Sequence, residues 1–251
     1  MTEPTIELRR AGLTSEPALR FIAEWAQHVG AAQVQLVDAA DDARLVREAL
    51  AAGEVLPVHG DRIYARSHPK DTARTEERTF VATADPRDRG VYNNWQPSGE
   101  IVPRVRELMR NAANGKTLYA IPYVMAPEGS PLTPWAVGLE LTDSQVVALH
   151  MIRMTRVGAR HLNNLQDQSH FVRGVHITGP LDDLKQGTAD DARHFVTVAD
   201  QRLILHFGSS YGGNALLAKI AHGLRQGSYD GYKSGRFLAE QFMLISVHDR
   251  V

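Results

Sequence analysis

The chain has 251 residues, a formal net charge of −1 at pH 7 and no cysteine. The small net charge provides no general basic field for nucleic acid or a membrane surface, and the lack of cysteine excludes disulfides, thiolate catalysis and cysteine-ligated metals. The sequence opens without a basic, apolar leader and has no run of about 18 apolar residues, so we expect a cytoplasmic protein without a membrane span.

Hydrophobic spacing and turn residues predict helices and strands that alternate along the chain. Ser15 followed by Pro17 places a cap and an early proline before the first helix. The predicted helices cover residues 18–26, 41–52, 101–113 and 212–224, with a helical turn at 236–241. The predicted strands cover residues 33–37, 78–83, 116–125, 136–143 and 242–247, with three short strands within 170–207. Residues 144–155 fit either state, and residues 54–100 are otherwise mostly loop.

This interleaving favours the α/β class with some α+β character, as a single lobe whose mixed sheet is flanked by helices. The stretch from Phe207 to Lys219 stands out within it. An apolar run, residues 203–207, leads into a Gly/Ser-rich turn and then into a helix-forming segment. Glycines let backbone N–H groups approach a ligand closely, and the start of a helix favours negative charge. The stretch therefore predicts a site for an anion.

From about residue 68 to residue 247 the chain resembles the N-terminal lobe of GTP-dependent phosphoenolpyruvate carboxykinases. The segments that carry the resemblance keep the order of that family: 71–74, 93–95, 116–132, 138–144, 154–158, 171–176, 208–219 and 237–245. We therefore expect one domain over residues 1–251, with a divergent part at 1–67 and a family-like core at 68–247.

The resemblance implies roles for several residues. Arg74 matches the arginine that grips the substrate carboxylate, and Tyr211 matches the tyrosine at the position of CO2 or the carboxylate. Gly213 and Asn214 lie in the substrate loop, and the adjacent Gly212 can form a turn or bind an anion.

The chain also departs from the family pattern. Ile220 and Gln241 stand where the family has a lysine and a histidine that ligate a metal, and neither replacement is a good transition-metal ligand. Lys219 could supply the positive charge instead. No Gly-x-x-x-x-Gly-Lys-[Ser/Thr] motif occurs, and the chain stops at Val251, where the nucleotide-binding lobe of the family would begin. We expect no metal cofactor and no GTP-dependent kinase activity from this chain alone.

Eleven histidines occur, but none has the His-x-x-x-His, His-Glu-x-x-His or His-x-His spacing of a metal site. We interpret most of them, including His150, as structural or surface residues. His206 and His222 flank the predicted anion site and stay open as functional candidates.

The leading hypothesis is a nucleotide-independent lyase: a decarboxylase, or enolisation catalyst, for a small anionic β-keto acid such as oxaloacetate or a phosphono or sulfono analogue, in a biosynthetic pathway. Loss of CO2 leaves an enolate that must be stabilised. Arg74, Lys219 and the amides of residues 212–214 are the candidates for this, with Tyr211 orienting the departing carboxylate and Gln241 contributing to binding.

The alternative is a non-catalytic pseudoenzyme that binds a small carboxylate metabolite or a protein partner. In the family a second lobe covers the site face. A lone lobe would leave that face open, so we also expect a homodimer.

Overall fold

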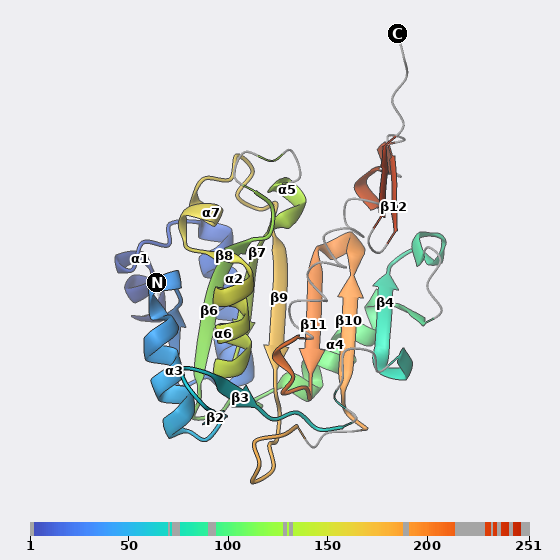
Figure 1. Ribbon diagram of the computed structural model, residues 1–251. Coiled ribbons are helices and arrows are strands. Elements are labelled where there is room, and N and C mark those ends of the chain that lie inside the picture. Colours follow the sequence, from blue (N-terminus) through green and yellow to red (C-terminus); the bar gives the residue numbers. More distant parts are fainter. Residues whose placement is uncertain are drawn as a thin grey trace.

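A nine-stranded mixed sheet forms the centre of the fold (Figure 1), in the order β1-β6-β7-β9-β11-β10-β4-β5 with β8 beside β6. The computed structural model describes residues 3–69, 71, 76–89, 94–127, 130, 133–187, 191–213, 229–231, 233–234, 237–240 and 243–246. The sheet strands are β1 (Gln33–Leu36), β4 (Thr79–Thr83), β5 (Trp95–Pro97), β6 (Thr117–Val124), β7 (Val137–Thr142), β8 (Arg156–Val157), β9 (Val172–Ile177), β10 (His194–Val198) and β11 (Leu203–Phe207). With helices on both faces, this confirms the predicted mixed α/β class.

Three neighbouring parallel strands finish at the same end of the sheet. β7, β9 and β11 run parallel to one another, while β6 and β10 flank them in the antiparallel sense. The chain therefore leaves Thr142, Ile177 and Phe207 at the same edge of the sheet, at the bottom of Figure 1. Segments that are far apart in the sequence meet there.

One face of the sheet packs against α2 (Glu16–Val29) and α4 (Ser98–Met109), which lie behind it in Figure 1. Both helices bury residues spaced three or four apart: Leu19, Ile22, Trp25 and Val29 on α2, and Ile101, Val105 and Met109 on α4. This spacing places one apolar stripe of each helix on the sheet.

The opposite face packs against α3 (Asp42–Ala51) and α6 (Gln145–Met154), which lie in front of the sheet. The buried strand β6 serves both faces, because successive side chains of a strand point to opposite sides. Leu118 and Ala120 join the α2–α4 cluster, whereas Tyr119 and Ile121 join the α3–α6 cluster.

The structure resolves the undecided segment 144–155 as the helix α6. Ser144 caps it, since its Oγ accepts a hydrogen bond from the amide of Val147 at 3.3 Å. A carboxylate oxygen of Glu54 accepts from the next free amide, that of Gln145, at 3.1 Å. The first turn of α6 is thus satisfied by side chains.

The smaller elements are α1 (Glu3–Arg10), α5 (Thr133–Ala136), α7 (Arg160–Asn163), the 3-10 turns 39–41, 76–78, 86–89 and 199–201, and the hairpins β2 (Val55–Pro57) with β3 (Ile63–Ala65) and β12 (Phe237–Glu240) with β13 (Met243–Ser246). No helix in the described ranges is long and apolar enough to span a bilayer.

Most predicted elements are confirmed, with three differences. The helical turn predicted at 236–241 is wrong over 237–240, where pairing with residues 243–246 makes a strand. The helix predicted at 101–113 begins at Ser98 and ends at Met109, and Asn111 then adopts a left-handed conformation with φ 56°. Short strands were missed within residues 54–100, because three residues are too few for a periodic pattern. Of the helix predicted at 212–224, only the first two residues are described, and both are helical.

Candidate functional site

The predicted anion-binding stretch follows β11, at the carboxyl ends of the parallel strands β7, β9 and β11. We call residues 208–213 the Tyr211 loop. Its first residue, Gly208, has φ 81°, a conformation that glycine adopts without strain, and its amide donates to the carbonyl of Ile177 at 3.0 Å. Ser209 and Ser210 are buried, and Tyr211 is half-buried. The loop is therefore built into the sheet edge.

A buried carboxylate holds the middle of the Tyr211 loop. Asp71, which is fully buried, accepts hydrogen bonds from the backbone amides of Ser210 at 2.7 Å and Tyr211 at 3.2 Å. The Ser210 hydroxyl lies 3.4 Å from the same oxygen. This internal carboxylate occupies the amides of Ser210 and Tyr211, which leaves the amides from Gly212 onward as candidate donors for an external anion.

A buried guanidinium holds the carbonyl side of the same loop. Arg193, 1% exposed, donates from Nε to the carbonyl of Gly208 at 3.2 Å and from Nη2 to the carbonyl of Gly187 at 3.4 Å. Its Nε also lies 3.8 Å from a carboxylate oxygen of Asp71. The two charged groups compensate each other while each binds a different set of backbone groups.

Two buried histidines lie beneath the loop on the α6 face of the sheet. His176 and His206 are register partners on β9 and β11, with ring centroids 5.3 Å apart. The Nε2 of His176 lies 2.8 Å from the carbonyl of Ser209. Since a carbonyl only accepts, this nitrogen carries the proton. Both rings are at most 2% exposed, which favours a supporting role for His206 over direct contact with a ligand.

The two glycines of the loop lie between side chains. A Cβ added to Gly213 would approach the ring of Tyr211 to 2.6 Å, so the phenol lies across Gly213. A Cβ added to Gly212 would approach Nδ1 of His150, on α6, to 2.4 Å. Tyr211, Gly212 and Gly213, all predicted as site residues, are thus brought together, and His150 joins them.

The other predicted site residues, Arg74, Asn214, Lys219 and Gln241, lie outside the described residues, as do Ile220 and His222. Their roles stay predictions.

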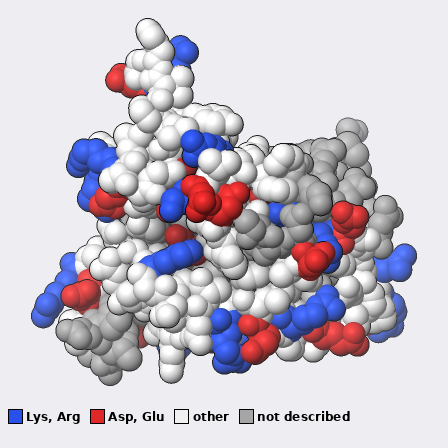
Figure 2. All heavy atoms as spheres, turned by 90° about the horizontal axis from the view of Figure 1, so that it is seen from below, with Lys and Arg blue, Asp and Glu red and all other residues white. Residues whose placement is uncertain are grey.

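A second polar cluster lies at the same sheet edge. The Nζ of Lys116 is 2.6 Å from a carboxylate oxygen of Asp143, and the amide of Thr178 donates to the other oxygen at 2.8 Å. Burial, and then the nearby Asp143 carboxylate, raise the pKa of Glu54. Figure 2 views the molecule from this side and shows basic and acidic side chains interspersed over the described surface. Asp143 and Ser144 have a structural role here, since their side chains accept hydrogen bonds from the backbone at a strand end and at the start of α6.

Within the described ranges, no three His, Asp or Glu side chains form a group that could hold a metal ion. The positions that the family resemblance ties to the metal fall outside those ranges. The expectation of a lost or weakened metal site therefore stays a prediction.

Sequence reasoning missed Asp71, Arg193 and His150 as parts of this arrangement. Asp71 belongs to a segment that carried the family resemblance, so its position was available as a signal. Arg193 and His150 gave none, because each reaches the loop only through the pairing or packing of distant segments.

Comparison with known proteins bears on what this arrangement is. The phosphoenolpyruvate carboxykinase N-terminal domain matches residues 20–232. Similar proteins include the phosphoenolpyruvate carboxykinases [GTP] of Corynebacterium efficiens, 30% identical over 94% of this chain, and of Chlamydia caviae, 38% identical over 76%. That of Neocallimastix frontalis is 35% identical over 73%.

The shared region covers only part of each relative. The chain spans 40% of the length of the Corynebacterium efficiens enzyme, 32% of the Chlamydia caviae enzyme and 31% of the Neocallimastix frontalis enzyme. The domain match over most of the chain, the order of the shared segments and the mixed sheet agree: the chain belongs to the phosphoenolpyruvate carboxykinase N-terminal domain family.

Proposed function

We propose that the Tyr211 loop binds a small anionic β-keto acid, such as oxaloacetate or a phosphono or sulfono analogue, and that the chain promotes its decarboxylation or enolisation without a nucleotide. The observation that carries the proposal is the pair of hydrogen bonds from the amides of Ser210 and Tyr211 to Asp71. They join the loop to the segment that leads to Arg74.

The sequence separation supports a role for Arg74 at this loop. Arg74 follows Asp71 by three residues, and three residues of chain span at most about 11 Å. This separation allows the guanidinium of Arg74 to reach the neighbourhood of Tyr211, as the proposal requires. Arginine binds carboxylates through two parallel hydrogen bonds, which orients the ligand as well as holding it. Membership of the carboxykinase domain family favours a substrate of this kind.

With oxaloacetate, the proposed reaction breaks the bond between the carbon next to the ketone and the carboxylate that this carbon carries; a phosphono or sulfono analogue has no carboxylate there and can only be enolised. CO2 departs, the bonding electrons pass into an enolate, and a proton later adds to the carbon. Negative charge on the enolate oxygen needs nearby cations and N–H donors. Arg74, Lys219 and the amides of residues 212–214 would supply them, while Tyr211 orients the leaving carboxylate.

The test is CO2 release from β-keto acids, starting with oxaloacetate, and exchange of the CH2 hydrogens of phosphonopyruvate with solvent deuterium, both without nucleotide and with or without a chelator. Wild type is compared with Arg74→Ala and with Arg47→Ala, a matched change at an exposed arginine on α3. We expect chelator-resistant release that disappears only in Arg74→Ala. Equal release from all three proteins would contradict the proposed site.

The alternative of a non-catalytic binding protein is decided by the same samples. No release, together with stabilisation of the wild type by oxalate and none of Arg74→Ala, would indicate a metabolite-binding pseudoenzyme. If neither release nor stabilisation occurs, the loop does not bind such acids.

A further inference from the structure

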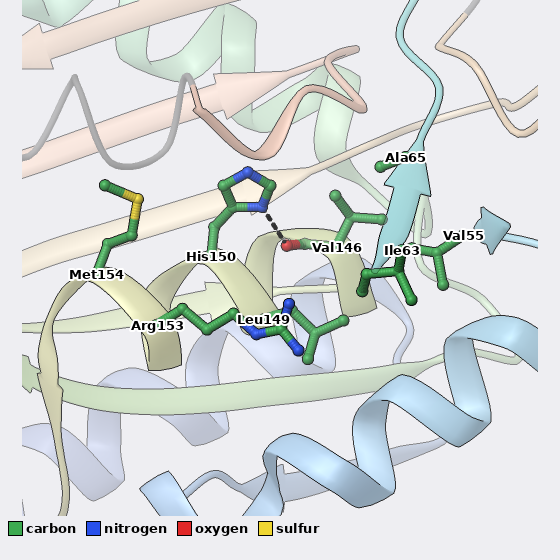
Figure 3. A pocket seen from close by; sticks show the side chains of 8 residues that line it. All are labelled: Val55, Ile63, Ala65, Val146, Leu149, His150, Arg153 and Met154. Atoms are coloured by element: carbon green, nitrogen blue, oxygen red, sulfur yellow. Dashed lines mark hydrogen bonds between the residues drawn. The ribbon is translucent and has the colours of Figure 1, made fainter. Parts of the chain in front are cut away.

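His150 has one ring nitrogen committed to its own helix. Its Nδ1 lies 2.8 Å from the carbonyl of Val146, one helical turn earlier. A carbonyl only accepts, so Nδ1 carries the hydrogen, and in the neutral ring Nε2 holds the lone pair. Figure 3 shows this bond and the ring pointing away from α3. Nε2 is the nitrogen that remains for chemistry.

The ring is fitted against the Tyr211 loop at Gly212, where any side chain would have to displace it. A Cβ at Gly212 would lie 2.4 Å from Nδ1 and 2.8 Å from Cε1 of His150. On the following residue, a Cβ at Gly213 would lie 2.8 Å from the hydroxyl oxygen of Tyr211. An imidazole from α6 and a phenol from the loop therefore lie against two consecutive glycines.

The surroundings of the ring are largely apolar. His150 borders a cavity of about 260 Å³ whose other walls include Val55, Ile63 and Leu149 (Figure 3). The charged group in this lining is Arg153, and its guanidinium is held by Asp42 of α3 at 2.7 Å and 3.0 Å. The imidazole can therefore exchange protons with solvent that enters the open cavity. The positive charge of Arg153 beside it is already compensated by Asp42.

We propose that His150 is the proton-transfer residue of the Tyr211 loop, an inference that rests on the proposed function. In the imidazolium form, Nε2–H gives its proton to the carbon that has lost CO2, which leaves a neutral ring. The ring then regains a proton from water through the cavity. In the enolisation direction the neutral Nε2 accepts the proton from the same carbon. The sequence pattern alone had favoured a structural or surface residue at this position.

A binding experiment separates this proposal from the proposed function. Histidine ring nitrogens of ¹⁵N-labelled protein are followed by NMR while oxalate, an unreactive dicarboxylate, is added at several pH values. We expect the Nε2 signal of His150 to shift in the wild type, because an anion bound beside the ring changes the charge near that nitrogen, but not in Arg74→Ala. If oxalate shifts the amide signals of Tyr211 and Gly212 but not the ring signals of His150, the proposed role of His150 is contradicted and the proposed binding site stands. If oxalate shifts neither, the proposed function fails and the inference falls with it.

A matched pair of variants tests the chemistry. His150→Asn keeps an N–H near the position of Nδ1 for the Val146 carbonyl but removes Nε2, and His59→Asn changes an exposed histidine between β2 and β3. We expect His150→Asn to lower turnover about 100-fold or more and to remove one limb of the pH profile, since positioned proton transfer contributes rate factors of that order. Oxalate affinity should stay unchanged, and His59→Asn should behave as wild type. Full turnover with an unaltered pH profile in His150→Asn would overturn the proposal.

Discussion

Asp71 and Arg193 fix the Tyr211 loop by binding different backbone groups. The carboxylate accepts from two amides, and the guanidinium donates to two carbonyls. Removing two such charges from water is costly, and their attraction offsets that cost only when the remaining polar atoms are also bonded. Here the loop itself provides those bonds. The geometry of Tyr211 thus depends on a charge pair that lies behind it.

Asp71→Asn tests this dependence. The amide replaces one acceptor oxygen by a donor that faces backbone N–H groups, and Arg193 loses its counter-charge. We expect the free energy of unfolding to fall by about 3 kcal/mol or more, because removing one partner of a buried pair strands the other. Urea denaturation gives the value. Asp85→Asn, at a surface pair with Arg87, is the matched control and should change stability little. Similar values for both variants would contradict the clamp.

Glu54 makes the folding stability of the protein depend on pH. Burial and the nearby Asp143 carboxylate raise its pKa, against the opposing effect of hydrogen bonds from Gln145 and Val146. A folded-state pKa above the unfolded value means that the folded protein binds more protons in that interval. Stability contributed by protonated Glu54 is therefore present at low pH and is lost as pH rises from the ordinary glutamate range through the raised pKa.

Glu54→Gln should remove that loss, because the amide does not ionise. The measurement is the urea midpoint of both proteins from pH 4 to pH 8. We expect the stability of the wild type relative to the variant to decline as pH rises through this interval. A difference that is constant with pH would show that Glu54 does not titrate there.

The residues of the site were only partly open to prediction, and the reason is the distance over which each acts. Tyr211, Gly212 and Gly213 are neighbours in sequence, so their local pattern announces a turn. Arg193 reaches the loop because β10 pairs with β11, and His150 reaches it because α6 packs over the sheet. Neither contact leaves a mark on the local sequence.

At the scale of elements, α6 connects the Lys116–Asp143 cluster with the Tyr211 loop. Its N-terminus is capped by Ser144 and Glu54 beside the Lys116–Asp143 cluster, and two turns later it presents His150 to Gly212. The local pattern of residues 144–155 fitted a strand as well as a helix, because seven of its twelve residues are apolar and they follow neither period clearly. The cap and the packing against α3 decide the outcome, and the second of these is tertiary.

Replacing the cap tests how much it contributes. Ser144→Ala removes the acceptor for the Val147 amide, and the loss should be about 1 kcal/mol in the free energy of unfolding, as at other helix caps. Ser144→Thr keeps a hydroxyl and serves as the control. Urea denaturation of both variants and the wild type is sufficient. A loss of stability in the threonine variant equal to that in the alanine variant would mean that packing, not the hydrogen bond, matters at this position.

At the scale of the whole molecule, described residues that follow the Tyr211 loop in the sequence lie at the opposite end of the central strands. The Tyr211 loop lies where β11 ends, whereas Asp230 bonds Arg202, just before β11 begins, and Trp135, just before β7 begins. Gly213 and Asp230 therefore lie at opposite ends of the central strands. The sequence announced the strands but not this return, which depends on an ion pair between distant segments.

Because the loop is clamped to the central strands, a ligand bound there should stabilise the whole sheet. Oxalate at about 100 times its dissociation constant should add about 2.7 kcal/mol to the free energy of unfolding. Urea transitions followed by far-UV circular dichroism and by tryptophan fluorescence should move together in the wild type and stay unmoved in Arg74→Ala. A shift in one probe alone would show that the ligand stabilises the loop and not the sheet.

The order of the strands also has a consequence during synthesis. Within the nine-stranded sheet, the three strands made first are β1, β4 and β5, which lie at its two edges; the strands that separate them, β6, β7, β9, β11 and β10, are made later. A growing chain thus contains strands from both edges of the sheet before the central strands with which they pair have been made. At roughly 5–20 residues per second, about 5–20 s pass between the synthesis of β5 and that of β11. During this interval the edge strands must be shielded from wrong partners, so we expect the yield of native protein to respond to the translation rate and to chaperones that bind nascent chains.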